Sequence, residues 1–349
     1  MSVRTAYERD FRVVLWLASL ILMWFTPSHV YAAARLEVGY VPILPMAQLY
    51  VMQGEGWTNA AGLDVRTSAF AEGPGIIQAL NDGKVDIAYF GIAPAMLAVS
   101  KGVDIKVVAT NVVEQVALMA RGDLTFYMLT DPVAGLKRFA AKKKRPARIA
   151  CFPVGSVPDA VFRFWLLEVA KLPLDSVDVV AMGASDMQAA LLAGTVDGAL
   201  GLEPILTVVA AQDRSAKVVL DGAEMMPNQP GAILAARGAT IRKQPQAVHK
   251  FVELHYRATE FLIREPDRAA KHAFAALSSG QSQLTLALIE KAMTSRYSKF
   301  VADPYRIMDS TQVMYAFQLK TGVLAQPIKI EQLFDTRFFD RASDGRKQR

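Results

Sequence analysis

Three residues, Gly73, Ala93 and Ser156, stand where the start of a predicted helix would expose unpaired backbone N–H groups. Gly73 and Ala93 are each followed by a Pro, which fits the first turn of a helix. The first N–H groups of a helix, together with the positive end of its dipole, bind oxyanions without any Lys or Arg. The pattern therefore indicates anion binding, although ordinary helix capping explains each position taken alone.

Residues that support catalysis in other proteins do not form a known constellation in this sequence. His249 and Glu253 have helical spacing, but the pattern lacks the second His of a zinc protease, so we expect no metal site. Ser156 has no G-x-S-x-G context, and no Lys-containing phosphate loop occurs. Cys151, the single Cys, lies in a strand-like stretch and is expected to be buried. We predict no catalytic residue, no cofactor and no enzyme activity.

A short phrase that occurs twice indicates how the chain is organised. Residues 79–88, ALNDGKVDIA, return as residues 190–199, ALLAGTVDGA. Each copy is typical of a helix end, a Gly that adopts the left-handed conformation, and a short strand opened by Val-Asp. One recurrence at this distance predicts two related lobes rather than a solenoid, which needs roughly three repeats or more. Because short strands alternate with helices, we expect an α/β fold with a mainly parallel sheet in each lobe.

The order of the predicted elements assigns residues to these lobes. We expect lobe I to be discontinuous, over 35–121 and 229–340, and lobe II to cover 122–228. Residues 341–349 are expected to form a frayed basic tail.

Two crossings between the lobes follow from this assignment. A strand over 116–120 is predicted to close the first sheet, and a strand over 231–236 is predicted to return to it. Hinge residues are expected where the chain crosses: Arg121, Gly122, Asn228 and Gln229.

The N-terminus is typical of an export signal. Three Arg residues precede an apolar run over 13–25, and Ala residues at 32–34 offer a cleavage site. The run is shorter than the about 20 residues that a membrane span needs. We therefore predict that 1–34 is a cleavable signal peptide and that the mature protein is periplasmic.

Composition limits the partners of the mature chain. The sequence has 349 residues, of which 52% are hydrophobic and 21% are charged, and its formal charge is +6. This length allows about two domains of roughly 150 residues each. The most basic run, 142–145, ends a predicted helix and has no interleaved aromatic residues, so we expect a solvated helix end and no nucleic-acid partner.

An ordered set of short phrases resembles a known family. The set comprises 39–42 (GYVP), 73–74 (GP), 83–86 (GKVD), 90–94 (FGIAP), 155–156 (GS), 194–197 (GTVD) and 203–204 (EP). From about residue 36 to 338 the chain is similar to the solute-binding proteins of nitrate, sulfonate and taurine ABC importers, a family that also includes pyrimidine-precursor binders. The resemblance implies a two-lobed periplasmic binding protein fold, type II-like, with two hinge crossovers that close on a small solute. It also implies delivery to an ABC permease in the inner membrane with a cytoplasmic ATPase, and we expect a monomer.

The resemblance further implies which residues line the cleft. Carried over by position, they are Pro42, Gly73, Gly91, Ile92, Ala93, Pro94, Gly155, Ser156 and Glu203. On this basis we expect a small anionic or zwitterionic solute such as a sulfonate, taurine or nitrate.

The sequence also departs from the family at two positions, so it does not decide which solute is bound. Val157 stands where sulfonate binders commonly have a Thr, and Leu202 stands where an aromatic residue is common. Aromatic residues near strand ends favour an aromatic or pyrimidine-type solute instead: Tyr40, Phe70, Phe90 and Phe152. The same sequence is compatible with an enzyme of the pyrimidine-precursor synthase type and with a periplasmic receptor that presents its closed form to a sensor.

Overall fold

A computed structural model describes residues 33–279 and 283–347 of the chain. The compact unit that begins at Ala34 contains all of the helices and strands of these ranges. The predicted signal peptide therefore lies almost wholly outside the described residues. Within the described ranges, every helix is too short or too polar to cross a lipid bilayer.

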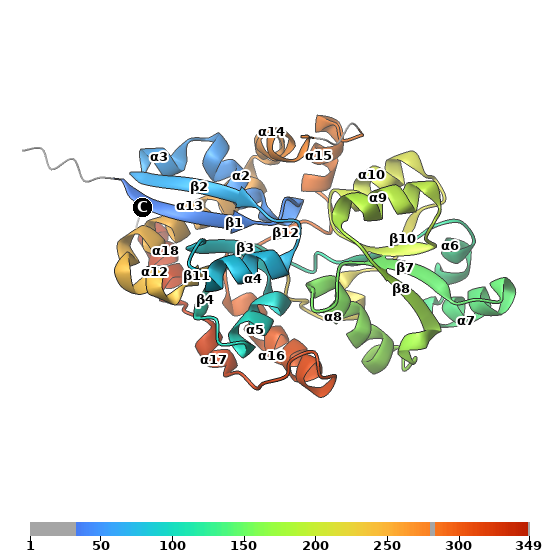
Figure 1. Cartoon of the computed structure of the whole chain (residues 1–349). Helices are drawn as coiled ribbons and strands as arrows, with labels where there is room; N and C mark the ends of the chain where they lie inside the picture. The colour runs from blue at the N-terminus through green and yellow to red at the C-terminus, as the bar shows by residue number, and fades with distance from the viewer. Residues whose placement is uncertain (1–32, 280–282, 348–349) are drawn as a thin grey trace, which may run out of the picture. The chain divides into compact units, whose positions relative to one another are not determined.

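The first sheet has five strands in the order β2-β1-β3-β11-β4 (Figure 1). β1 is parallel to β2 and β3, whereas β11 is antiparallel to β3 and β4. β11 enters from the later half of the chain, which confirms the predicted return to this sheet. The strands are β1 (Ala34–Tyr40), β2 (Leu63–Ala69), β3 (Ile87–Gly91), β4 (Ile105–Thr110) and β11 (Ala232–Arg237).

The second sheet repeats this topology in the order β8-β7-β9-β6-β10. β7 is parallel to β8 and β9, and β6 is antiparallel to β9 and β10. Each sheet therefore has three parallel strands, then an antiparallel strand, then an edge strand. The strands are β6 (Ala117–Ala120), β7 (Ala147–Cys151), β8 (Val177–Ala181), β9 (Gly198–Gly201) and β10 (Lys217–Leu220).

The repeated phrase lies at equivalent places in the two sheets, immediately before and within β3 and β9. Asp86 Oδ2 accepts a hydrogen bond from the backbone N–H of Glu37 in β1 at 3.1 Å. Asp197 Oδ2 accepts one from the backbone N–H of Arg148 in β7 at 2.8 Å. Each carboxylate also pairs with an Arg side chain. The repeated Asp thus ties the start of β3 to β1 and the start of β9 to β7.

The predicted position of 116–120 in the first sheet is wrong. β6 lies between β9 and β10 of the second sheet. All four residues of β6 are buried, so this apolar run is suited to the middle of either sheet. Only the strands that it pairs with decide which sheet it joins. The first crossing therefore runs over 111–116, and we propose that the boundary of lobe I moves there from 121.

Arg121 and Gly122 lie beyond the crossing, at the carboxyl end of β6. The Arg121 guanidinium pairs with Asp213 at 3.1 Å, and the backbone N–H of Gly122 donates to Ser215 Oγ at 3.0 Å. Both residues are therefore attached to loops of the second sheet, because β6 has already joined that sheet.

The two crossings lie side by side. The backbone N–H of Glu114 donates to the Gln229 carbonyl at 3.0 Å, and that of Val116 donates to Gln229 Oε1 at 3.1 Å. The backbone N–H of Asn228 donates to the Glu114 carboxylate at 3.2 Å. A two-stranded sheet of β5 (Val112–Val113) and β12 (Lys299–Phe300) continues this connecting region. A hinge role for Asn228 and Gln229 stays a prediction.

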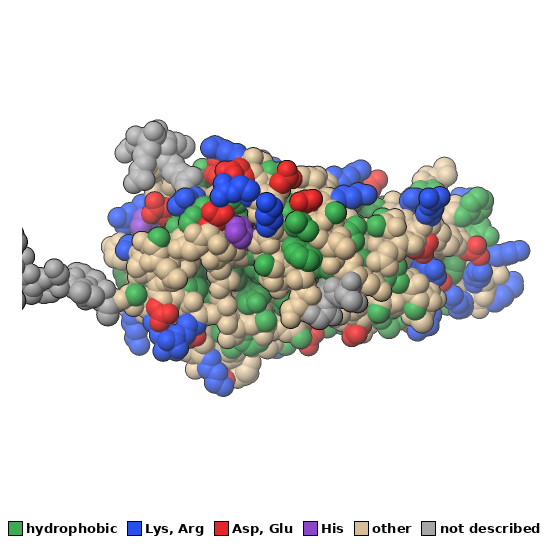
Figure 2. Space-filling model, turned by 90° about the horizontal axis from the view of Figure 1, so that it is seen from above, with side chains coloured by type: hydrophobic (Ala, Val, Ile, Leu, Met, Phe, Trp, Pro, Cys, Tyr) green, Lys and Arg blue, Asp and Glu red, His purple; other side chains and the backbone are tan. Residues whose placement is uncertain are grey.

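Helices flank both sheets, and the long helix α13 packs against α2, α14 and α18 beside the first sheet (Figure 1). Lys and Arg side chains gather at the end of the molecule where α7 lies, with acidic side chains among them (Figure 2). The helices are α2 (Ala47–Gly54), α3 (Trp57–Ala60), α4 (Gly73–Asn81), α5 (Ile92–Ser100), α6 (Gly122–Met128), α7 (Pro132–Lys143), α8 (Val157–Phe164), α9 (Ala184–Ala193), α10 (Ile205–Gln212), α11 (Gly222–Met225), α12 (Gly238–Lys243), α13 (Pro245–Arg264), α14 (Pro266–Leu277), α15 (Leu286–Met293), α16 (Tyr305–Lys320), α17 (Ile330–Leu333) and α18 (Arg337–Lys347).

Candidate functional site

A cavity of about 80 Å³ lies where loops from the two sheets meet. Because a buried water needs roughly 10–15 Å³ of such space, the cavity has room for about five to eight water-sized groups. This volume suits a small solute. The lining residues are Val41, Ile43, Met46, 71–74, Ile77, Phe90, Gly91, Pro94, Leu97 and Ala232 from the first sheet and its helices, 152–158 and Leu202 from the second, and Gln115 from the connection.

The structure brings together five of the nine predicted cleft residues. These five line the cavity from both sheets: Gly73, Gly91, Pro94, Gly155 and Ser156. Pro42 and Glu203 instead line a second cavity of about 430 Å³, next to α9. Ile92 and Ala93 line neither cavity and are fully buried. A binding role for each of the nine stays a prediction.

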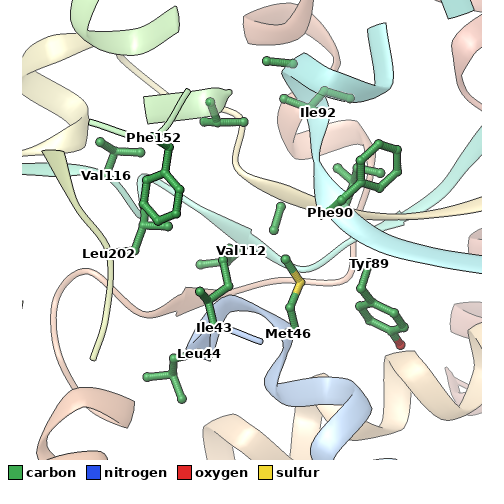
Figure 3. Close-up of a cluster of buried hydrophobic side chains, with 14 of the residues drawn as sticks. Ile43, Leu44, Met46, Tyr89, Phe90, Ile92, Val112, Val116, Phe152 and Leu202 are labelled. Atoms are coloured by element: carbon green, nitrogen blue, oxygen red, sulfur yellow. The ribbon is translucent and has the colours of Figure 1, made fainter. Parts of the chain in front are cut away.

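Two of the four aromatic residues that the sequence singled out also line the cavity. Phe90 comes from β3, and Phe152 comes from the end of β7. Figure 3 shows Phe152 beside Leu202, across from Ile43 and Met46. The other two aromatic side chains pack elsewhere: Tyr40 against Tyr50, and Phe70 against Gly39 and Gly75.

The two sides of the cleft come into close contact at Gly91. A Cβ atom added to Gly91 would lie 2.8 Å from Val157 Cγ2, at the start of α8. Such a distance is shorter than any real Cβ contact, so the absence of a side chain at Gly91 permits the approach. Gly155, on the opposite side, has φ of +86°, which a residue with a side chain rarely adopts.

A carboxylate of the protein itself already fills the N-terminus of α8. Asp159 is 3% exposed, and its Oδ2 accepts a hydrogen bond from the Gly155 N–H at 3.0 Å. Its Oδ1 accepts one from Arg163 Nε at 2.6 Å, and its backbone N–H donates to Ser156 Oγ at 3.3 Å. Two of the groups beside Ser156 are therefore already engaged within the protein: the Gly155 N–H by the Asp159 carboxylate, and the Asp159 N–H by Ser156 Oγ.

The other two helix starts are also poorly suited to an anion. Glu72, which lines the cavity, is the residue immediately before α4 and adds a second carboxylate there. At the start of α5, the Ile92 N–H donates to the Gly231 carbonyl at 3.0 Å. Among the described residues that line this cavity there is no Lys, Arg or His. The local charge thus favours an uncharged solute over an anion.

Gln115 is the lining residue that the sequence reasoning missed. It is 3% exposed, and its Oε1 is buried without a hydrogen-bond partner. The only signal in the sequence is one amide between two apolar runs, which has no motif. A buried, unpaired amide is rare in folded proteins and needs an explanation.

Glu203 uses its oxygens to cap its own helix. It is 3% exposed, and its carboxylate accepts hydrogen bonds from the N–H and the hydroxyl of Thr207, at 3.1 and 3.0 Å. Burial raises the pKa of Glu203, and hydrogen bonds from Ser295 and Thr207 partly oppose that rise. Glu203 thus has a structural role at the edge of the second cavity.

A family model covers all of the residues that line the cavity. The model of the NMT1-like family matches residues 32–278. The chain belongs to the NMT1-like family. Curated relatives from Brucella abortus and Brucella suis, described only as binding proteins, are each 24% identical over 258 residues, which is 73% of this chain and 75% of theirs.

Solved structures show that this NMT1-like protein has the predicted periplasmic binding protein fold. The periplasmic nitrate-binding protein of Synechocystis has a TM-score of 0.76 at 13% identity, over 90% of this chain and 89% of its own. The alkanesulfonate-binding protein of Xanthomonas axonopodis, bound to MOPS, has a TM-score of 0.68 at 18% identity, over 87% and 98%.

Other groups of the NMT1-like protein that could react are fixed in the core. His255 Nε2 donates to the Thr110 carbonyl at 2.8 Å, and the Tyr89 hydroxyl donates to His255 Nδ1 at 3.1 Å. Burial lowers the pKa of His255 to about 4. Cys151 is buried, as predicted, and this burial raises the pKa of its thiol. In the described ranges, no group of three His, Cys, Asp or Glu side chains has the arrangement of a metal site.

Proposed function

We propose that this NMT1-like protein is an exported solute-binding protein of an ABC import system. It captures a small solute between its two lobes and delivers it to a permease in the inner membrane that is driven by a cytoplasmic ATPase. In this proposal it works in the periplasm as a monomer, without a cofactor and without catalysis. The nitrate-binding and sulfonate-binding proteins that share its fold support this assignment.

The observation that most supports this function is a cavity whose lining residues come from both sheets. A solute in the cavity contacts Phe90 on one side and Phe152 on the other, so it favours the arrangement in which the two sides meet. The connection over 111–116 and the return over 228–231 lie side by side and are the proposed hinge.

For the solute we favour an aromatic or heterocyclic compound over the small anion. The supporting observation is the buried carboxylate of Asp159 at the start of α8, where an anion was expected. The Glu72 carboxylate also lines the cavity, and the described residues of this lining include no cation that would pair with an anionic solute.

A thermal-shift screen of the chain from Ala34 onward tests the proposal. The panel contains pyrimidines, pyridones, aromatic carboxylates, sulfonates, taurine and nitrate. A solute at 100 times its Kd adds about 2.7 kcal/mol to the free energy of unfolding, a shift of several degrees. Gly91→Val, which crowds Val157, should reduce the shift, whereas Gly183→Val should not, because nothing lies within 4 Å of a Cβ at Gly183. A panel without any shift, or one that shifts the Gly91 variant equally, would contradict the proposal.

A further inference from the structure

We propose that Gln115 selects the solute, and that the solute is an uncharged ring that carries a hydrogen-bond donor next to an acceptor, as in a lactam or an amino-substituted nitrogen heterocycle. This inference rests on the proposed function and names the solute class for the same cavity.

The first argument is the unpaired amide of Gln115. The side chain lies in the connection between the sheets, where it lines the cavity and is 3% exposed. In the described part of the chain, its Oε1 is buried and has no hydrogen-bond partner. Because a buried amide without partners is unfavourable, the missing partners are expected to come from the ligand.

The second argument is that the oxygen of the neighbouring amide, that of Gln229, is already paired within the protein, although its Nε2 is buried without a partner. Gln229 Oε1 accepts the backbone N–H of Val116 at 3.1 Å. A Cβ added to Gly231 would lie 3.1 Å from the Gln115 side-chain carbon Cδ, so the backbone packs directly against the Gln115 amide. Gln115 is therefore confined on one side by Gly231, and it also lines the cavity.

The third argument is the chemistry of the surroundings. An amide offers an N–H donor and a carbonyl acceptor side by side, which is complementary to the edge of a lactam or an aminopyrimidine. A carboxylate or sulfonate has acceptors only, so it would leave the Gln115 oxygen unpaired. The remaining lining is apolar and includes the rings of Phe90 and Phe152, which suits a flat ring.

The position of Gln115 also connects recognition to closure. Gln115 lies between Glu114 and Val116, whose backbone N–H groups both bind Gln229 of the return crossing. A ligand that pairs with Gln115 thus contacts the connecting segment itself as well as both sides of the cleft.

Three probes of similar size separate these solute classes in a calorimetric titration of the chain from Ala34 onward. 2-Pyridone has the donor–acceptor edge, 1-methyl-2-pyridone has lost the donor, and methanesulfonate is an anion. We expect 2-pyridone to bind at least about tenfold more tightly than either of the others, because each of them leaves a buried group of Gln115 unpaired.

Variants of Gln115 test whether this residue makes the distinction. In Gln115→Leu, of similar size, binding of 2-pyridone should weaken about tenfold and the preference over 1-methyl-2-pyridone should disappear. Gln53→Leu, at an exposed Gln, is the matched control and should retain wild-type binding. If Gln115→Leu does not fold, Gln115→Met serves in its place. The melting curve of each variant without a probe reports its folding.

The outcomes separate this inference from the proposed function. Preferential binding of methanesulfonate, or unchanged binding of 2-pyridone by the Gln115 variant, would overturn the role of Gln115 while leaving a solute-binding protein. If the three probes and every solute of the thermal-shift panel fail to bind, the proposed function itself is refuted.

Discussion

Replacement of Asp159 by Ala removes the carboxylate that fills the start of α8. The Gly155 N–H then loses its acceptor, which lies at 3.0 Å in the wild type. Because the Asp159 side chain is only 3% exposed, this N–H is left without a partner in a buried place. An orphaned buried donor costs about 1–3 kcal/mol, and the loss of a negative charge at a helix N-terminus costs about 0.3–1 kcal/mol. The partly exposed pair with Arg163 adds less than about 1 kcal/mol. We expect the variant to lose about 2–4 kcal/mol of unfolding free energy.

Asp159→Asn is the matched control because it keeps an acceptor for the Gly155 N–H and loses only the charge. Its expected loss is about 1 kcal/mol. Urea unfolding of the three proteins, followed by circular dichroism, measures the differences as shifts in the midpoint.

A second measurement asks whether α8 then becomes an anion site. In Asp159→Ala the N-terminus of α8 is empty of its own carboxylate, so sulfate should raise the melting temperature of this variant more than that of the wild type. Chloride at equal ionic strength corrects for the general effect of salt. If Asp159→Ala loses less than about 0.5 kcal/mol and gains nothing extra from sulfate, the carboxylate does not fill the site as argued.

Two further predictions concern the cleft contact and the core. Gly91→Val should weaken solute binding about five- to a hundredfold while secondary structure is retained, because relief of the 2.8 Å approach to Val157 costs about 1–3 kcal/mol in the closed form. Titration with a solute found in the panel measures the affinity of each variant. Equal affinity of Gly91→Val and Gly183→Val for that solute would contradict this prediction. His255 has a pKa of about 4 in the folded protein against 6.5 when unfolded, so the unfolded chain binds more protons between these values, and stability that is fully present above pH 6.5 is lost as the pH falls toward about 4. The loss from this group is about 3 kcal/mol, and His255→Gln should show a correspondingly flatter decline of unfolding free energy over that range; parallel curves for the two proteins would show that His255 is not buried in its neutral form.

Local patterns were sufficient for much of the architecture. The Val-Asp phrase at 85–86 and 196–197 predicted two related halves, because the left-handed Gly and the strand-opening Asp act over only a few residues in sequence. The helix start at Ser156 was visible for the same reason, and in the structure Ser156 caps α8. The return of 231–236 to the first sheet was also predicted, and it is observed as β11.

Other features depend on partners that are distant in sequence. β6 is a short buried apolar strand, and its hydrophobicity is the same in either sheet, so its position was decided by its pairing with β9 and β10. This pairing also moved the first crossing away from Arg121 and Gly122.

The same division applies to the cleft. The sequence by itself determined the two related α/β halves and several of the glycines and caps at helix starts, because those preferences are set by backbone conformation and near neighbours. Only the tertiary structure decided that the Asp159 carboxylate fills the start of α8, that Gly91 meets Val157, and that the Gln115 amide lies unpaired beside a cavity. Hydrogen-bond satisfaction and close contact are properties of groups brought together by folding, and the order of residues along the chain does not record them.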